Sequence, residues 1–325
     1  MEINGFNITE QKGSNGGFPQ LIVKDAGDLS PFGFDVKGTF ESGQCFRWKK
    51  VDDGRYFGIV RDKAVYVSAK NKRDLLIENS TAQDFKNIWY DYFDLGTDYS
   101  HIIKEVEKDD FMTSAIRFSG GARMLVQDFE ETLYSYILSS QNNIPRIIKL
   151  VDSLCSLYGE KIYYKSSLGE KILMGHAFPD SGKLALNFCT REGCGSCGSR
   201  SGLCDKPFAG YRCPYIRKTA LMIYTGEFVL DRNLLASSTA EQSRKELCRL
   251  SGVGEKVADC VLLYSGIRKD ICPIDVWVEK TIKHIYLDDS AKKADIRNFT
   301  QDYFGKHAGY AQLWFFNYAR TQKLV

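Results

Sequence analysis

The sequence contains no apolar run of about 18 residues, the length that a helix needs to cross a membrane. Its first five residues lack the basic segment and apolar segment of a secretory signal peptide. Internal repeats, low-complexity tracts and recognisable nuclear or mitochondrial signals are absent as well. We therefore expect no membrane association and a prokaryotic, cytoplasmic location.

A strong excess of either charge is also missing. The 44 lysines and arginines are balanced by 41 aspartates and glutamates, for a formal net charge of +3. This balance excludes a histone-like polycation but allows local basic patches. The apolar fraction of 43% and the charged fraction of 26% are typical of a globular protein, and 325 residues suffice for two domains. The ten cysteines lack a secretory context, which favours reduced thiols or metal ligands over disulfides.

The hydropathy pattern divides the chain into three parts. Residues 1–17 are polar and glycine-rich, and we expect a flexible lead. Short alternating stretches from residue 18 onward predict an antiparallel sheet domain with flanking helices over 18–118. From residue 81 to the end, apolar residues recur at the spacing of an α-helix, which predicts a helical domain over 119–325. The expected fold class is α+β. The expected strands are 20–24, 34–40, 45–51, 56–60 and 64–69, and the expected helices are 81–91, 99–108, 109–118, 129–140, 145–158, 180–187, 214–225, 239–250, 255–265, 275–286, 290–304 and 307–322.

One stretch, L-S-G-V-G-E-K-V-A-D-C over residues 250–260, predicts two helices joined by a tight hairpin within 239–266. Glycines on both sides of one valine, at Gly252, Val253 and Gly254, allow a sharp backbone turn. The N–H groups at the start of the second helix favour a phosphate. Such a contact would hold a nucleic-acid backbone without reading its sequence.

A lysine and a carboxylate follow this hairpin. Lys256 lies in the first turn of the second helix, and Asp275 follows a proline where it can cap the next helix. A deprotonated lysine is a nucleophile, so the pair suggests attack on C1′ of a sugar, loss of the base and formation of a Schiff base. The carboxylate could stabilise the cationic sugar. The hairpin alone would also be explained by an ordinary glycine turn with a solvated lysine.

Three further segments carry polar or aromatic side chains at expected turns. The segment S-G-Q-C-F-R-W at 42–48 is a loop that enters a strand, which structure alone would explain. The segment S-S-Q-N-N-I-P-R at 139–146 is either a well-capped helix start or a polar wedge presented to DNA. The segment G-Y-R at 210–212 is a turn whose tyrosine and arginine could stack on a base or bind its edge.

Together these segments resemble the motifs of the 8-oxoguanine DNA glycosylases/AP lyases of the helix-hairpin-helix Gly/Pro-Asp superfamily. They occur in the same order as in that family, and the resemblance extends from about residue 18 to the C-terminus. The resemblance implies a TATA-binding-protein-like antiparallel domain packed on a helical glycosylase domain. It implies a monomer that acts on double-stranded DNA with 8-oxoguanine opposite cytosine, in base excision repair. With the expected prokaryotic cytoplasmic location, this places the protein at the nucleoid. It implies no cofactor for catalysis.

The resemblance also implies roles for individual residues. Lys256 would be the nucleophile and Asp275 the catalytic carboxylate. The Gly43 carbonyl would accept the N7–H that distinguishes 8-oxoguanine from guanine. The flipped base would be bound on its Watson–Crick edge and on both faces by Gln312, Phe316 and Cys260. The gap in the duplex and the orphaned cytosine would be contacted by Asn142, Arg146, Tyr211 and Arg212.

Two departures from the animal enzymes concern DNA contacts. Gln141 stands where those enzymes carry a third asparagine, so discrimination of the opposite base would loosen. Trp277 replaces a histidine two residues past the aspartate, which removes an expected phosphate contact.

The largest departure is an insertion at about 189–208. Its cysteines have the spacing C-x4-C-x2-C-x6-C, and the four are Cys189, Cys194, Cys197 and Cys204. Four thiolates in a glycine-rich loop suit a closed tetrahedral zinc site. An iron–sulfur cluster and a loop without metal remain as alternatives. A structural zinc would stiffen the segment that leads into the G-Y-R turn.

Two other functions remain compatible with parts of the sequence. A helix-hairpin-helix glycosylase for alkylated or other oxidised purines would share the hairpin and the lysine, but Gly43, Gln312 and Cys260 match an 8-oxoguanine pocket. A catalytically idle DNA-binding module would share the hairpin, but the intact pair of Lys256 and Asp275 argues against it.

Overall fold

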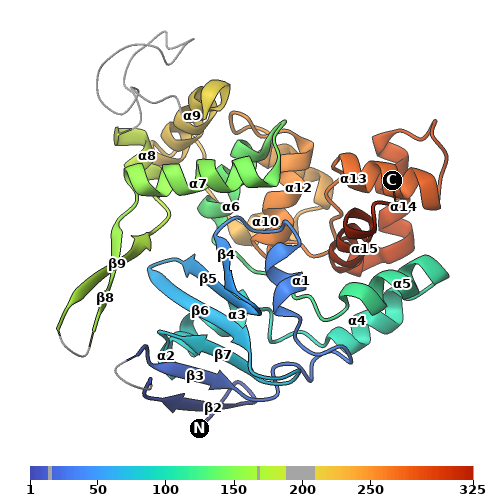
Figure 1. Cartoon of the computed structure of the whole chain (residues 1–325). Coiled ribbons are helices and arrows are strands. Elements are labelled where there is room, and N and C mark those ends of the chain that lie inside the picture. The colour runs from blue at the N-terminus through green and yellow to red at the C-terminus, as the bar shows by residue number, and fades with distance from the viewer. Residues whose placement is uncertain (14–16, 167–168, 188–208, 325) are drawn as a thin grey trace.

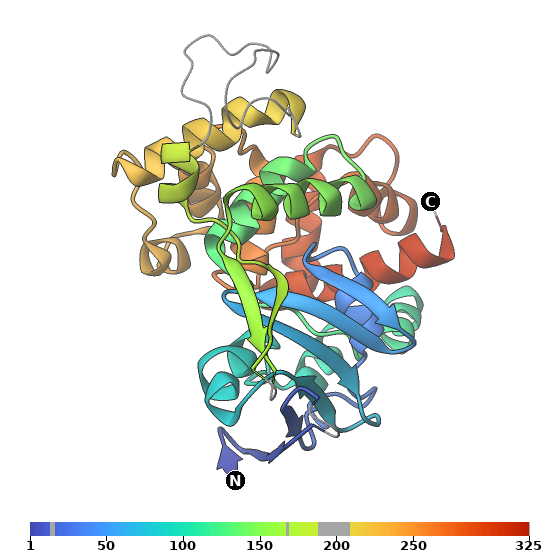
Figure 2. The ribbon, with the colours of Figure 1, turned by 60° about the vertical axis from the view of Figure 1, so that its left-hand side comes forward.

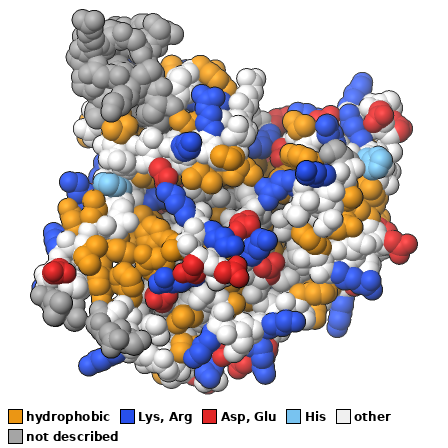
Figure 3. Space-filling view, viewed as in Figure 1, with side chains coloured by type: hydrophobic (Ala, Val, Ile, Leu, Met, Phe, Trp, Pro, Cys, Tyr) orange, Lys and Arg blue, Asp and Glu red, His pale blue; other side chains and the backbone are white. Residues whose placement is uncertain are grey.

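The computed structural model describes residues 1–13, 17–166, 169–187 and 209–324 (Figure 1). The described chain forms an antiparallel sheet domain beside a larger helical domain, as the α+β prediction required. Among the described residues, no helix is long and apolar enough to cross a membrane. On the face shown in Figure 3, lysines and arginines are scattered among acidic side chains, in keeping with the small net charge.

The sheet has seven strands in the described residues, in the order β1-β2-β3-β7-β6-β5-β4, and each neighbouring pair is antiparallel. The strands are β1 (Glu2–Ile3), β2 (Phe6–Gln11), β3 (Gln20–Val23), β4 (Trp48–Asp52), β5 (Arg55–Val60), β6 (Lys63–Ala69) and β7 (Leu75–Glu78). Short helical segments pack on one face of this sheet and bury Phe85, Trp89 and Phe93. They are α2 (Ala82–Asp84), η2 (Phe85–Trp89) and α3 (Tyr90–Tyr92).

The expected flexible lead at residues 1–17 is wrong for its first part, because β1 and β2 belong to the sheet. Ile3 pairs with Phe6 around a two-residue turn, Asn4-Gly5, in which both residues have positive φ. An Asn-Gly pair between apolar residues is a strong hairpin signal, and the polar composition concealed it. Ile8 is 2% exposed and pairs with Val23, so packing against the sheet holds this segment in place.

The expected strand at 34–40 is instead the helix α1 (Val36–Glu41). The Asp35 carboxylate accepts a hydrogen bond from the Gly38 N–H at 2.9 Å and caps the helix. Val36 and Phe40, four residues apart, are both buried on one side of it. An N-cap followed by apolar residues at helical spacing therefore outweighs the local alternation.

Most of the helices expected from the spacing of apolar residues are present in the helical domain. Its elements are α4 (Tyr99–Val106), α5 (Asp110–Ser119), α6 (Phe129–Ser139), α7 (Ile144–Tyr158), α8 (Ser181–Asn187), η4 (Gly210–Arg212), α9 (Cys213–Tyr224), α10 (Arg232–Ser237), α11 (Ala240–Leu247), α12 (Glu255–Tyr264), α13 (Val276–Ile285), α14 (Lys293–Phe304), η5 (Gly305–His307) and α15 (Ala308–Gln322). The expected domain boundary at 118 shifts, because α4 and α5 bury Ile102, Val106 and Ile116 in the core of the helical domain.

A β-hairpin interrupts the part expected to be helical throughout. Strands β8 (Lys161–Lys165) and β9 (Lys171–His176) pair with each other and extend beside the sheet domain (Figure 2). A Cβ on Gly175 would lie 2.5 Å from Ile59 Cδ1, and the rings of Tyr164 and Phe18 are 4.4 Å apart. The hairpin is stabilised by these contacts with a distant part of the chain, which the local period does not reveal.

Candidate active site

The predicted helix-hairpin-helix is present as α11, a hairpin and α12. The Thr239 hydroxyl and the Gln242 side chain form the expected capping box at the start of α11. Gly252 has a φ of +80°, and a Cβ there would lie 2.6 Å from Tyr215 Cβ. Only glycine fits this turn. Gly254 is the N-cap of α12, and a Cβ added there would meet open space.

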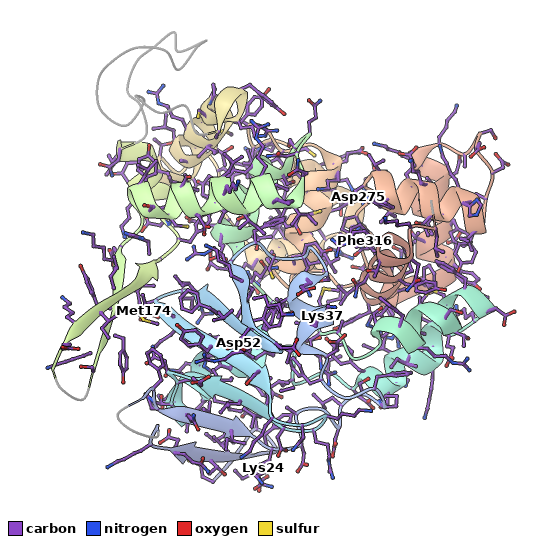
Figure 4. All side chains as sticks on the ribbon, viewed as in Figure 1. Lys24, Lys37, Asp52, Met174, Asp275 and Phe316 are labelled. Carbon is purple, nitrogen blue, oxygen red and sulfur yellow. The ribbon has the colours of Figure 1, made fainter. Side chains whose placement is uncertain are left out.

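A cavity of about 390 Å³ lies where α6, α7, α12, α13 and α15 meet the loop after α1. The residues predicted to act on the sugar and the base converge on it: Gly43, Lys256, Cys260, Asp275, Gln312 and Phe316. Asn142 also lines it. Asp275 and Phe316 lie on neighbouring helices at this point (Figure 4). The lining does not include Gln141, Arg146, Tyr211, Arg212 or the hairpin residues 252–254.

Lys256 points from the first turn of α12 into the cavity. Its Nζ lies 5.0 Å from the centre of the Tyr136 ring and 3.4 Å from Ser139 Oγ. An ammonium over an aromatic face is stabilised by the ring quadrupole, so the side chain is held in a defined place. Burial raises the pKa of the neighbouring Cys260 to about 12, so this thiol stays protonated at neutral pH. Lys256 is the amine that lines the cavity, at the position where the sequence predicted the nucleophile.

Asp275 is the N-cap of α13. Its Oδ1 accepts a hydrogen bond from the Val278 N–H at 2.8 Å. Burial raises the pKa of this carboxyl, while the N–H groups of Val278 and Trp277 and the charge of Lys256 act in the opposite direction. The carboxylate is thus fixed by a helix terminus inside a poorly solvated cavity, where its charge acts strongly on a cationic sugar.

A stack of two tyrosines orients the glutamine that was predicted to read the base. The rings of Tyr136 and Tyr264 are stacked at 5.5 Å, and the Tyr264 hydroxyl donates to Gln312 Oε1 at 3.2 Å. Gln312 is 4% exposed. With its oxygen engaged, the Gln312 amide group leaves its N–H donors for a ligand in the cavity.

The loop that carries Gly43 is held rigidly by the next residue. The Gln44 side chain donates to the carbonyls of Thr39 and Arg123, at 2.9 and 2.8 Å, and accepts from the Leu125 N–H at 2.8 Å. Gly43 itself has a φ of +86°. Sequence reasoning found Gly43 through its motif but missed that the adjacent glutamine is the residue that positions it.

Arg320 also lines the cavity and was missed in the sequence. It is one helical turn beyond Phe316 and two turns beyond Gln312, so the spacing on α15 could have revealed it. Its guanidinium lies 5.3 Å from the centre of the Phe316 ring and donates to the Glu41 carbonyl.

The predicted wedge and cytosine-binding residues lie around the loop between α6 and α7: Arg146 is in the first turn of α7, and Tyr211 and Arg212 contact the loop from η4. The Arg212 side chain is 3% exposed and donates to the carbonyls of Ser140 and Gln141, at 3.0 and 3.2 Å. The Tyr211 hydroxyl donates to Ser140 O at 3.1 Å. Arg212 and Tyr211 therefore brace the loop in this structure. Gln141, with a φ of +48°, and Arg146 are exposed.

Metal-binding candidates fall in two places. The predicted cysteine ligands at 189, 194, 197 and 204 lie outside the described residues. Within the described ranges, one group has ligand atoms close together: His101, Glu105 and His307. Lys306 Nζ is 3.4 Å from the same Glu105, and both histidines lie 2.9 Å from it, so an ion-pair cluster explains this group. It does not line the cavity.

The chain is similar to known DNA glycosylases in sequence and in fold. The model for the N-terminal domain of 8-oxoguanine DNA glycosylases matches residues 28–133. MBOgg1, solved with a low-affinity DNA ligand, is 36% identical, with a TM-score of 0.82 over 98% of this chain and 99% of that one. The 8-oxoguanine glycosylase/lyase of Clostridium acetobutylicum, solved with double-stranded DNA containing cytosine opposite 8-oxoguanine, is 33% identical, with a TM-score of 0.80 over 98% of this chain and 99% of that one.

A relative from Methanothermobacter thermautotrophicus, described as a probable N-glycosylase/DNA lyase, is 26% identical over 314 residues, which span 90% of this chain and 95% of that protein. The similarity to the two solved structures covers nearly the whole of both chains. The chain therefore belongs to the 8-oxoguanine DNA glycosylases of the helix-hairpin-helix superfamily and is a DNA-repair glycosylase with lyase activity.

Proposed function

We propose that this protein removes 8-oxoguanine opposite cytosine from double-stranded DNA, with Lys256 as the nucleophile and Asp275 as the catalytic carboxylate. The observation that carries the proposal is the convergence of Lys256, Asp275, Gly43 and Gln312 on one cavity of about 390 Å³. A base inside a duplex is inaccessible to Lys256, so the nucleotide is flipped into the cavity before the reaction.

The neutral amine of Lys256 attacks C1′ as the bond from C1′ to N9 of the base breaks. The bonding electrons leave with the base, which takes up a proton. The Lys256 nitrogen loses one of its two protons. As the C1′–O4′ bond breaks, O4′ takes up a proton from solvent, and the nitrogen keeps its other proton in a protonated Schiff base to C1′, which accepts the electrons of the next step. Removal of a proton from C2′ then expels the 3′ phosphate by β-elimination, which nicks the strand.

Asp275 stabilises the positive charge that develops on the sugar as the base departs. Its position at the N-terminus of α13 keeps the carboxylate oriented, and its burial strengthens its field at the reacting carbon. In the cavity, Phe316 and Cys260 cover the two faces of the base, and Gln312 binds its Watson–Crick edge.

Opposite-base recognition is assigned to the loop between α6 and α7. Asn142 lines the cavity and would occupy the gap left by the flipped nucleotide. Arg146 is exposed and free to bind the orphaned cytosine, whereas Arg212 and Tyr211 support the loop from behind. Because Gln141 replaces an asparagine of the animal enzymes, we propose that this protein prefers cytosine over the other opposite bases less strongly than those enzymes do.

The test is borohydride trapping on a duplex with one 8-oxoguanine opposite cytosine, comparing the native protein with Lys256→Gln. We expect a covalent adduct with the native protein and none with the variant, because borohydride reduces the Schiff base to a stable amine. The same assay on duplexes with adenine, guanine or thymine opposite the lesion measures how strongly the protein prefers cytosine as the opposite base.

Two results would refute the assignment. Release of free base without an adduct would make the protein a glycosylase that uses water instead of Lys256. Binding of the lesion duplex with neither adduct nor free base would make it a damage-binding module.

A further inference from the structure

The last helix presents a third side chain to the cavity, beyond the two expected from the family motif. Gln312, Phe316 and Arg320 follow one another at intervals of four residues on α15 and all line the cavity. Residues at this spacing share a helix face. The face that was expected to bind and stack the base therefore also carries a cation, at the end nearest the Gly43 loop.

Two contacts fix the Arg320 guanidinium in that place. One amino group, Nη2, donates to the carbonyl of Glu41, the last residue of α1. The guanidinium also lies over the Phe316 ring, 5.3 Å from its centre. A planar guanidinium held by one hydrogen bond and one ring contact has a defined direction for its other N–H groups.

The second amino group borders Gly43. A Cβ built on Gly43 would lie 3.2 Å from Arg320 Nη1, and 3.8 Å from the Phe316 ring. Among the described residues, the Glu41 carbonyl is the hydrogen-bond acceptor found for Arg320. The Nη1 group therefore brings N–H donors to the edge of the cavity beside Gly43 and above the stacking ring.

The chemistry of the lesion supplies an acceptor for such a donor. 8-Oxoguanine differs from guanine by a hydrogen on N7 and an oxygen on C8, and these are neighbouring ring positions. If the Gly43 carbonyl accepts a hydrogen bond from N7–H, the oxygen on the neighbouring C8 atom lies next to the carbonyl oxygen, at the same edge of the base. Guanine has only a C–H at C8, so a donor facing it would lose its water without gaining a partner.

We propose that Arg320 is a specificity-determining residue, which donates from Nη1 to the C8 oxygen of the flipped base while the Gly43 carbonyl accepts from N7–H. This inference rests on the proposed function, because it requires 8-oxoguanine in the cavity. The Gly43 carbonyl, an acceptor, and the Arg320 guanidinium, a donor, would then each recognise one of the two differences between 8-oxoguanine and guanine. The charge of Arg320 strengthens its bond to a neutral oxygen acceptor.

The experiment compares single-turnover base release from duplexes that carry either 8-oxoguanine or 8-thioguanine opposite cytosine. The thio base keeps N7–H but offers sulfur, a poor hydrogen-bond acceptor, at C8. The native protein, Arg320→Met and Lys323→Met are compared. Lys323 is the exposed C-cap of α15 and does not line the cavity, so its variant removes a charge from the end of this helix only.

We expect the native protein and Lys323→Met to prefer the oxo base by roughly 10- to 100-fold, the factor that a charged hydrogen bond contributes. Arg320→Met should release 8-oxoguanine more slowly by a similar factor and should lose the oxo preference. Binding to a duplex with a tetrahydrofuran abasic site, which has no base, should remain within about twofold in every variant.

Several outcomes would overturn the inference. If the native protein releases 8-oxoguanine and 8-thioguanine at nearly the same rate, a hydrogen bond to the C8 oxygen is excluded. An unchanged preference in Arg320→Met would leave Arg320 as a support for the Gly43 loop only, and weaker abasic-site binding would assign it to a DNA phosphate. If Arg320→Met fails to fold, Arg320→Lys, which keeps the charge but loses the planar pair of donors, takes its place. Failure of the native protein to release 8-oxoguanine would instead refute the proposed function.

Discussion

Arg244 and Asp259 form a buried ion pair that joins the two helices of the hairpin motif. Arg244 Nε donates to Asp259 Oδ1 at 2.7 Å, and the two side chains are 8% and 1% exposed. Arg297 Nη2 lies 3.9 Å from the second oxygen. Asp259 follows Lys256 by less than one turn of α12, so this pair fixes the helix that carries the proposed nucleophile.

Removing the carboxylate of this pair should destabilise the protein strongly. In Asp259→Ala, Arg244 keeps a buried charge without its partner, and we expect the free energy of unfolding to fall by about 3–5 kcal/mol. Urea unfolding followed by circular dichroism measures it. The control is Asp152→Ala, which removes the partner of Lys49 from an exposed pair and should cost less than about 1 kcal/mol. Similar losses in both variants would contradict the role of the buried pair.

Replacing Asp275 by asparagine should separate its catalytic role from its structural role. Asparagine is as good an N-cap as aspartate, so α13 should keep its cap and the unfolding free energy should change by less than about 1 kcal/mol. The charge is lost, so single-turnover release of 8-oxoguanine should slow by about 100-fold or more. A near-native rate would show that the carboxylate charge is not needed for base release.

Glu131 should make the stability of the protein depend on pH. Burial raises the pKa of this carboxyl to about 7 from the ordinary value of 4.5, although the charge of Arg47 opposes the shift. The folded state therefore holds a proton that the unfolded chain releases earlier. The resulting stabilisation is complete below pH 4.5 and is lost as the pH rises through about 7, with an upper limit of about 3 kcal/mol.

The variant Glu131→Gln tests this dependence, because glutamine remains neutral at every pH. Urea unfolding at about pH 5 and pH 8 should show a smaller loss of stability in the variant than in the native protein. The same slope in both proteins would mean that the carboxyl titrates normally in the folded state.

The two glycines of the hairpin should differ sharply in their tolerance of a methyl group. Gly252 has a φ of +80°, and an added Cβ would lie 2.6 Å from Tyr215 Cβ, so Gly252→Ala should distort the turn and weaken binding to an abasic-site duplex by roughly tenfold or more. Gly254 has a φ of −94° and open space around it, so Gly254→Ala should fold normally. Fluorescence anisotropy measures the binding. Equal affinities for the two variants would exclude a special role for the turn at Gly252.

The local features of the hairpin motif could be read from the sequence because they depend on neighbouring residues. The capping box of Thr239 and Gln242 and the N-cap of Asp275 are contacts over three residues, and each is present. Local reasoning failed where a short segment depends on a distant surface. The strand β2 is held by β3, and the β8–β9 hairpin packs beside β5.

The sequence by itself determined which chemical groups this protein has and on which elements they lie: Lys256 at the start of a helix, Asp275 as a cap, Gly43 in a turn, and Gln312 with Phe316 on one face. Only the tertiary structure decided how these groups meet. It brings Arg320 to the carbonyl of Glu41, a residue 279 positions earlier, and it directs the Arg212 guanidinium to the backbone of residues 140 and 141. The physical reason is that helical period and capping reach over only a few residues, whereas burial, orientation and pKa depend on what the packed core places beside each group.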